Sequence, residues 1–384
     1  MAIADNPDGD YELIADIDLS GEDWIPVPFR GKLNGNGCTI YNITINELEK
    51  EPPIIAHNAN NLTYWNTNFA GFFSRLEGAE VSNLNLLGAE VRIDCKDNAF
   101  AGILAGYSQN SDIKNCSVSG RVYLKSTRIL LGVGGLLGYG NANVTGCKID
   151  SELVFETNWR EFPNFCEEYL GGIVANGSGN LKDNHVRVRG FATIHGFAHN
   201  GGIAGIYRDH DANRRAKNAY VIENNEIDAE INFFEHTQGR HAFCNLIWGE
   251  RAGANVTVKD NIELHYVRNE FFNYNVVLSP EKCENPEYKV VIVNPNGDFF
   301  GFTEHTCLLC GYSYRSDYFS QADYDAENTV SESDKRSADR EVSGIKIDLG
   351  FLEKREVKMF LLVNLGFIII VMLISSSFSR RRRY

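Results

Sequence analysis

Five short segments of this 384-residue chain begin with two small residues and continue with apolar ones, and they recur at nearly even distances. The second small residue of each pair is a glycine, and successive glycines are 31, 33, 37 and 30 residues apart. These glycines are Gly71, Gly102, Gly135, Gly172 and Gly202. Self-similarity with a period of about 30 residues is the signature of a repeat architecture. It therefore predicts a stack of like units.

A second pattern of six residues, such as VSNLNL from Val81, follows each glycine pair. Its first and last residues are aliphatic, and its fourth residue runs Leu84, Cys116, Cys147, Asn184, Asn225. Short apolar runs bounded by Gly and Asn favour strands over helices. Two short strands in each unit fit a coil of parallel strands, in which like residues lie above one another about 4.8 Å apart. The pattern predicts a β-solenoid with aliphatic columns inside.

Two columns of this coil have a predicted structural role. The glycine column marks a corner where a side chain has no room or where φ is positive. In the other column, the amides of Asn184 and Asn225 would hydrogen-bond from rung to rung. Cys116 and Cys147 would share that column as small packing residues with free thiols. A disulfide between them is the alternative.

The entry segment and the first repeats resemble a known family. The stretches are DGDYELIADIDLSG from Asp8, FRGKLNGNGCTI from Phe29 and AGILAGYSQNSDIKNCSVSG from Ala101. Together they are similar to the GLUG-motif surface proteins of bacteria and protists, over about residues 6–232. The resemblance implies a right-handed parallel β-helix that serves for display or as an extension at the cell surface. The motif of this family carries no catalytic residues. We expect an all-β chain in which residues 1–265 form this β-helix.

After the repeat fades, residues 266–319 are expected to form a small Cys-bearing β cap or two worn rungs, because the last rung of a solenoid exposes apolar columns and strand edges. A Cys-x-x-Cys pair here is half of a zinc ribbon. The interpretations are a structural zinc site, a local disulfide or buried unligated thiols. The residues concerned are Cys283, His305, Cys307 and Cys310.

The C-terminal part predicts attachment to a membrane. Residues 320–350 are polar and charged and read as a flexible stalk. Within residues 351–384, Met359–Phe378 are twenty residues without a charge, enough for a helix of about 30 Å, the thickness of the hydrocarbon layer. The block Arg380–Arg383 favours a C-terminus inside the cell and a solenoid outside. Residues 1–19 contain no apolar run typical of a secretory signal, so the chain is either a fragment or reaches the membrane without one.

Composition narrows the function. The net charge is −14, and no basic groove offsets it, so nucleic acid is not an expected partner. No phosphate loop, nucleophile elbow or recurring carboxylate column is visible. We therefore expect no cofactor and no catalytic residues.

The insertions between repeats fall just before the glycine pairs, so in a solenoid they share one edge, where partners often bind. Aromatic side chains on them would stack on sugars or anchor a protein; folding back to cover the flank is the alternative. They are Trp65, Trp159, Phe162 and Phe165.

We expect a membrane-anchored cell-surface β-solenoid for adhesion, display or the binding of matrix or glycan. The first alternative is an anchored carbohydrate-active enzyme of the polysaccharide lyase or hydrolase type. The second is a tail-anchored scaffold that faces the cytosol.

Overall fold

The computed structural model describes residues 2–49, 67–127, 130–157, 167–194, 197–208, 219–235, 242–252, 255–272, 287–296, 299–308 and 313–325. The chain divides into a compact unit, Met1–Tyr324, and a second unit, Asp325–Tyr384, of which only Asp325 is described. Apart from the short helix α1 (Ala2–Asp5) and a helical turn at residues 321–325, which begins the segment predicted as a flexible stalk, the elements are strands. The predicted all-β class is confirmed.

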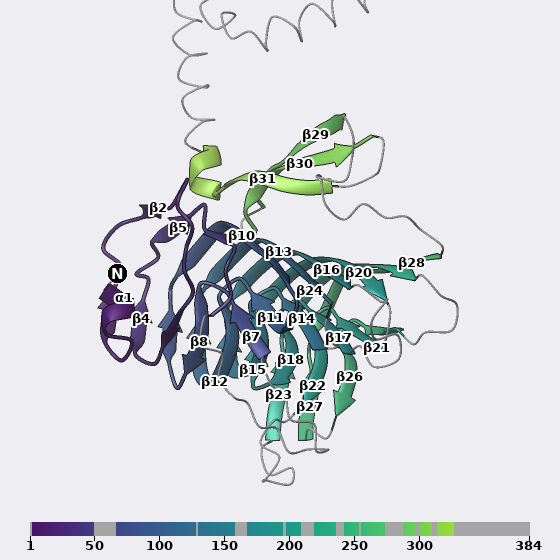
Figure 1. Ribbon diagram of the computed structural model, residues 1–384, viewed down its shortest axis with the longest axis horizontal. Helices are drawn as coiled ribbons and strands as arrows, with labels where there is room; N and C mark the ends of the chain where they lie inside the picture. The colour runs from purple at the N-terminus through teal and green to yellow at the C-terminus, as the bar shows by residue number, and fades with distance from the viewer. Residues whose placement is uncertain are drawn as a thin grey trace, which may run out of the picture. The chain divides into compact units, whose positions relative to one another are not determined.

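Three parallel sheets make up most of the first unit (Figure 1). The chain visits them in turn, so that β9, β10 and β11 form one rung and β12, β13 and β14 the next. The strands of each sheet consequently follow one another in chain order. This is a parallel β-solenoid, as the repeat predicts.

The first sheet has 13 strands, and its main path is β1 (Asp10–Glu12), β4 (Lys32–Asn34), β9 (Glu80–Ser82), β12 (Ala105–Lys114), β15 (Leu137–Thr145), β18 (Val174–Ser178), β22 (Ala204–Arg208) and β26 (Trp248–Ala252). Five further strands belong to this sheet. Of these, β8 (Phe73–Glu77) and β19 (Leu181–Lys182) pair with the main path, β3 (Val27–Phe29) pairs with β8, β23 (Ala219–Glu223) with β19, and β27 (Asn255–Lys259) with β23.

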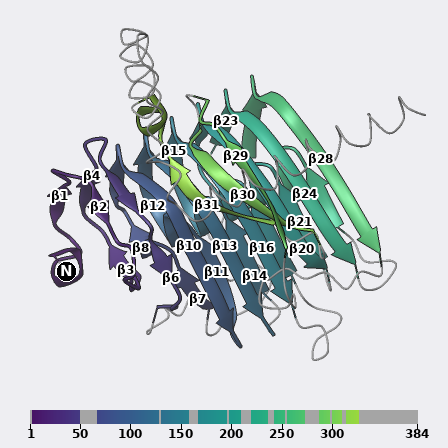
Figure 2. The ribbon, with the colours of Figure 1, turned by 90° about the horizontal axis from the view of Figure 1, so that it is seen from above.

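The second sheet has nine strands: β2 (Ile17–Asp18), β5 (Thr39–Tyr41), β6 (Thr44–Ile45), β10 (Asn85–Cys95), β13 (Ser117–Ser126), β16 (Lys148–Thr157), β20 (His185–Ile194), β24 (Glu226–Glu235) and β28 (Ile262–Phe272). Its long strands β10, β13, β16, β20, β24 and β28 run side by side in Figure 2. The third sheet has six: β7 (Thr67–Ala70), β11 (Asn98–Gly102), β14 (Leu130–Gly134), β17 (Glu167–Gly171), β21 (Phe197–Gly201) and β25 (Ala242–Asn245).

The interior of the coil consists of columns of like apolar residues. In the nine-stranded sheet one such column runs through five consecutive rungs, and each member is at most 1% exposed: Leu86, Val118, Ile149, Val186, Ile227. Because β-strands alternate their side chains between two faces, every second residue of these strands points into this core. The intervening residues form the outer face.

The predicted glycine column is wrong by one residue at its middle. Gly102 pairs with Gly134, one position before Gly135, and Gly134 pairs in turn with Gly171. Gly135 and Gly172 form a neighbouring column, since a Cβ on Gly135 would lie 2.1 Å from the carbonyl oxygen of Gly172. Where two glycines are adjacent, the sequence alone left the register open.

The glycines at this corner are required by space. A Cβ on Gly134 would lie 1.8 Å from the carbonyl oxygen of Leu137, closer than any real Cβ contact. A second glycine four residues later, missed in the sequence, recurs for the same reason: a Cβ on Gly138 would lie 2.7 Å from the backbone nitrogen of Ala101. The corner is so sharp that the two strands flanking it approach backbone to backbone. In later rungs, Gly205 and Gly249 occupy the position of Gly138.

The polar column lies as one vertical row. The side-chain oxygen of Asn184 accepts a hydrogen bond of 2.9 Å from the backbone nitrogen of Cys147, and Asn225 does the same for Asn184 at 3.1 Å. Asn261, absent from the prediction, continues the row below Asn225 at 3.0 Å. Cys116 and Cys147 are buried free thiols. Each amide thus satisfies a corner nitrogen that would otherwise be buried without a partner.

The residues after the solenoid form a separate antiparallel sheet of three strands, β29 (Tyr288–Val293), β30 (Gly301–Cys307) and β31 (Ser313–Phe319). We expected a cap on the last rung. Instead β31 contacts β10 and β13, on the outer face of the nine-stranded sheet. In the last rung, Ile262 and Leu264 remain 51% and 54% exposed.

The space requirement at the corner gives a first prediction. Gly134→Ala should lower the free energy of unfolding by about 3 kcal/mol, because its Cβ meets backbone that cannot move aside cheaply. The denaturation midpoint in urea measures this loss.

Gly78→Asn is the matched control, since Gly78 has a φ of 67° with no atom within 4 Å of its Cβ position, and Asn tolerates this left-handed conformation. It should change stability by no more than about 0.5 kcal/mol. Equal losses in the two variants would show that crowding at the corner is not what the glycine relieves.

Candidate binding face

The outer face of the nine-stranded sheet carries a column of alternating charge. Register places five residues of consecutive rungs directly beside one another, and they alternate between carboxylate and guanidinium: Glu90, Arg121, Glu152, Arg189, Glu230. Adjacent parallel strands are about 4.8 Å apart, so each of the three middle residues has opposite charges on both sides. This order stabilises the column, which like charges at the same spacing would disrupt.

A second column runs beside the first, two residues earlier on each strand. It consists of Ser119, Asp150, Arg187, Asp228 and His265. We call the surface formed by these two columns the charged face. Its strands, β10 to β28, are the longest in the molecule, so the face is broad and nearly continuous.

The centre of the charged face is buried. The carboxylate of Asp150 accepts two hydrogen bonds from the guanidinium of Arg187, the longer of 2.9 Å. Arg121 lies 2.9 Å from Glu152, and the side chain of Glu152 is 1% exposed. Buried carboxylates are tolerated only when a cation compensates them, and here each one has a guanidinium beside it.

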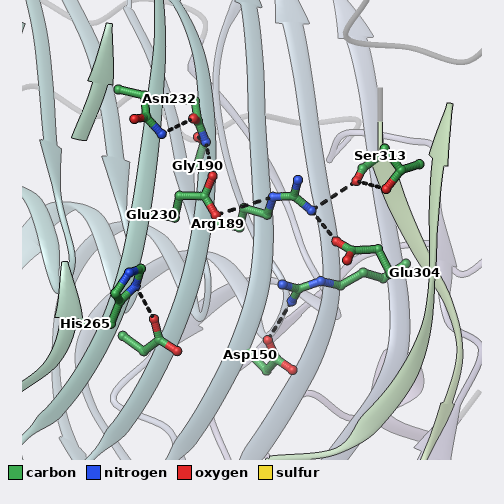
Figure 3. Close-up of polar contacts among 12 residues, drawn as sticks. Asp150, Arg189, Gly190, Glu230, Asn232, His265, Glu304 and Ser313 are labelled. Carbon is green, nitrogen blue, oxygen red and sulfur yellow. Dashed lines mark hydrogen bonds and ion pairs between the residues drawn. The ribbon is translucent and has the colours of Figure 1, made fainter. Parts of the chain in front are cut away.

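The C-terminal sheet covers this centre with complementary charges (Figure 3). Arg315 of β31 donates a 2.9 Å hydrogen bond to Asp150, and Arg189 donates one of 2.5 Å to Glu304 of β30. Arg189 also donates to the hydroxyl of Ser313 at 3.1 Å. Asp150 and Arg189 of the solenoid therefore each meet an opposite charge on the C-terminal sheet.

Aromatic rings complete the contact. The guanidinium of Arg187 lies 4.4 Å from the ring centre of Phe299, and that of Arg315 lies 4.3 Å from Phe302. Burial raises the pKa of Tyr318, and the nearby Arg315 opposes that rise. The contact therefore combines ion pairs with cation–π stacking, a combination that guanidinium groups favour.

Some polar atoms under the C-terminal sheet have no hydrogen-bond partner. In the described residues these include Oε2 of Glu152, the hydroxyl of Ser119 and Nε of Arg315. A buried donor or acceptor without a partner costs about 1–3 kcal/mol. The contact between the C-terminal sheet and the solenoid is therefore incompletely satisfied, as are some sites within the solenoid, such as Ser151 and Asn200.

Part of the charged face is open to solvent. Asp228 and Glu230 of β24 are 37% and 40% exposed, and His265 of β28 lies 3.3 Å from Asp228 (Figure 3). Two carboxylates two residues apart on one strand face point the same way. This open part can offer carboxylate acceptors and a histidine to a ligand.

Of the predicted binding and metal-site residues, the structure describes only His305 and Cys307. The aromatic candidates Trp65, Trp159, Phe162 and Phe165 lie outside the described residues, as do Cys283 and Cys310. His305 hydrogen-bonds to Ser316 at 2.8 Å and stacks on Tyr314. Cys307 is buried. Among the described residues no three His, Cys, Asp or Glu side chains are grouped as metal ligands would be.

The charged face was missed in the sequence although its signal was present. Arg121, Glu152, Arg189 and Glu230 each follow the half-buried fifth residue of the six-residue pattern by four positions. Glu90 follows it by five, because the strand has an irregularity between Leu86 and Ala89. The column does not recur as one residue type, because carboxylates and guanidinium groups alternate in it. Its signal is visible only when the six-residue pattern is extended by four residues.

The fold and this face define a parallel β-solenoid with a charged lateral surface. No family model matches the chain, and no curated protein matches it. Among solved structures the chain is similar to an IgA1 protease, with 19% sequence identity and a TM-score of 0.39. The likeness covers 71% of this chain and 20% of that one, so this chain spans a fifth of its length. It carries no argument about function.

In the part of the chain that the structure describes, none of the helices has the length and apolarity needed to cross a bilayer. The predicted membrane segment Met359–Phe378 lies outside the described residues.

The ion pairs give a second prediction. Arg315→Gln should speed hydrogen exchange of residues 301–307 at least tenfold, because it removes the cation that the C-terminal sheet supplies to the buried Asp150. The solenoid strands β12 and β13 should keep their protection, since Arg187 still neutralises Asp150. Exchange followed by mass spectrometry measures both.

Lys259→Gln provides the control, because Lys259 belongs to an ion pair with Glu223 in which its own side chain is 48% exposed. Such a pair is worth at most about 1 kcal/mol. Unchanged exchange of residues 301–307 in the Arg315 variant would contradict our account of how the C-terminal sheet is held.

Proposed function

We propose that the chain is a membrane-anchored, cell-surface β-solenoid of the GLUG type, right-handed, that displays one edge for adhesion to glycan or protein. The observation that carries this proposal is the shared edge. Every strand of the nine-stranded sheet from β10 to β24 is followed by a strand of the six-stranded sheet. Because all these strands are parallel, the connections leave the solenoid along a single edge.

The longest of these connections contain the aromatic candidates. One joins β6 to β7 and includes Trp65; another joins β16 to β17 and includes Trp159 and Phe162. Aromatic side chains on neighbouring loops are suited to stack on sugar rings or to anchor a protein partner. A rigid rod that gathers variable loops on one side favours binding over catalysis.

Anchoring is supported by the sequence. Met359–Phe378 is long and apolar enough to span a bilayer, and the cations of Arg380–Arg383 favour an internal C-terminus. The polar residues 320–350 would separate the solenoid from the membrane as a stalk.

The proposal predicts both topology and binding. On intact cells, external protease should digest the solenoid, and an epitope tag placed after Tyr384 should remain protected. Complete protection of the solenoid would favour the cytosolic scaffold instead.

On arrays of glycans and matrix proteins, the full chain in detergent should bind, and Trp159→Ala should weaken that binding about tenfold.

Tyr11→Ala, on the first rung and away from this edge, is the matched control and should leave binding unchanged. Failure of the full chain to bind any glycan or matrix protein would count against display. Equal weakening by both variants would mean that the shared edge is not the binding site.

One observation favours an anchored carbohydrate-active enzyme as the second candidate. The open carboxylates Asp228 and Glu230 are two residues apart on β24, so their Cβ atoms are about 7 Å apart. Glycosidases that invert configuration use carboxyl groups about 6.5–9.5 Å apart. Cβ atoms at this spacing allow the two carboxyl groups to lie within the range that acid and base catalysis on a sugar chain needs.

This candidate predicts cleavage of a polysaccharide from a panel of acidic and neutral chains, followed by release of reducing ends. Asp228→Asn and Glu230→Gln should each lower that rate at least a hundredfold. Glu250→Gln, in a different sheet, should not. Activity that survives in both carboxylate variants would remove this pair from consideration.

A further inference from the structure

The C-terminal sheet is held on the solenoid by side chains and not by strand pairing. In the described residues, β29, β30 and β31 pair only with one another, whereas every rung of the solenoid is joined to the next by a backbone ladder. Within the same compact unit, the sheet is thus docked on the charged face without a shared backbone ladder. Its undocking would break no ladder of the solenoid.

The docked surfaces are complementary in charge. Glu304 and Arg315 lie directly opposite each other on β30 and β31, which places one anion beside one cation. They meet Arg189 and Asp150, one cation and one anion on neighbouring strands of the charged face. An occupant of this site must bring both charges at this spacing. The C-terminal sheet of this chain is such an occupant, so every copy of the chain carries both the site and a sheet that fits it.

The chain between the two bodies is long. Fourteen residues, 273–286, join β28 to Glu287. Extended at about 3.4 Å per residue they reach about 48 Å, the width of about ten adjacent strands. This length allows the C-terminal sheet to reach the charged face of a neighbouring copy.

We propose that the C-terminal sheet docks on the charged face of a second copy of this chain, so that two copies exchange their sheets. The same contacts form within one chain and between two, so exchange needs no new interface. The unpartnered atoms of Glu152, Ser119 and Arg315 lower the cost of opening the closed form. Crowding of copies on one surface then favours the exchanged form by mass action.

The contacts of the exchange need only the solenoid and its C-terminal sheet, whereas the crowding that favours it rests on the proposed membrane anchor. The inference adds a partner, a second copy, to the display role, and it stands whether or not the loop edge binds glycan.

Two charge reversals test it. Arg189→Glu and Glu304→Arg each place like charges in contact when the sheet docks on its own chain or on an identical copy. When the two variants are mixed, each C-terminal sheet matches the charged face of the other variant. We expect differently tagged copies of the two variants to co-purify from detergent at least tenfold better when mixed than either variant does with itself.

Protection of residues 301–307 from hydrogen exchange should return in the mixture. The double variant R189E/E304R is the control: alone, it restores the pair within one chain and should regain protection without a partner. Restored protection in the double variant together with no pairing in the mixture would overturn the proposal.

A second measurement leaves all charges in place. Benzoylphenylalanine, a photo-cross-linker, replaces Phe299, which lies over Arg187. Copies labelled with ¹⁵N are mixed with unlabelled copies and irradiated. Cross-linked peptides that join a labelled to an unlabelled copy show exchange. The same group at Ile292, which is 67% exposed, measures the background from copies that share a micelle. Mixed-label products at Phe299 no more frequent than this background would overturn the proposal.

Discussion

The structure depends on one constraint: parallel strands of successive rungs are held in register by backbone hydrogen bonds, so each residue lies directly above its equivalent in the repeat. A residue type that suits its place in one rung must suit its neighbours above and below. This requirement explains the apolar column from Leu86 to Ile227 and the amide row from Asn184 to Asn261. It also explains the glycines, because the same sharp corner recurs in each rung and leaves no room for a Cβ.

Register has a different consequence outside the coil. Charged residues that repeat identically would repel one another at strand spacing, so a lateral face can hold a long charged column only if the signs alternate. The column from Glu90 to Glu230 follows this rule through five rungs. The C-terminal sheet then docks by continuing the rule, since Arg315 meets Asp150 and Glu304 meets Arg189. The charged face is thus both a stable part of the solenoid and a surface that recognises a complementary one.

The solenoid was predicted well from the sequence, whereas the charged face and the position of the C-terminal sheet were not. The physical reasons differ. The amide row was found because its residues must stay alike to satisfy one another. The glycine column was found with an error at Gly135, since either glycine of the pair Gly134–Gly135 fits a pattern based on residue type. The charged face was missed because its residues alternate. The position of the C-terminal sheet was predicted wrongly, since exposed strand edges suggested an end cap and the ion pairs that hold the sheet join residues as far apart as Asp150 and Arg315.

By itself the sequence determined the all-β class, the parallel stacking and most of the interior columns, because these follow from short-range periodicity that every rung repeats. The tertiary structure alone decided which glycines pair between adjacent strands, how the outer charges alternate and where the C-terminal sheet docks. Those features arise between residues separated by one rung or by half the chain, and the identity of either partner does not specify the other. The strand register of the folded coil determines which glycines and which charges become neighbours. The long-range ion pairs determine where the C-terminal sheet docks.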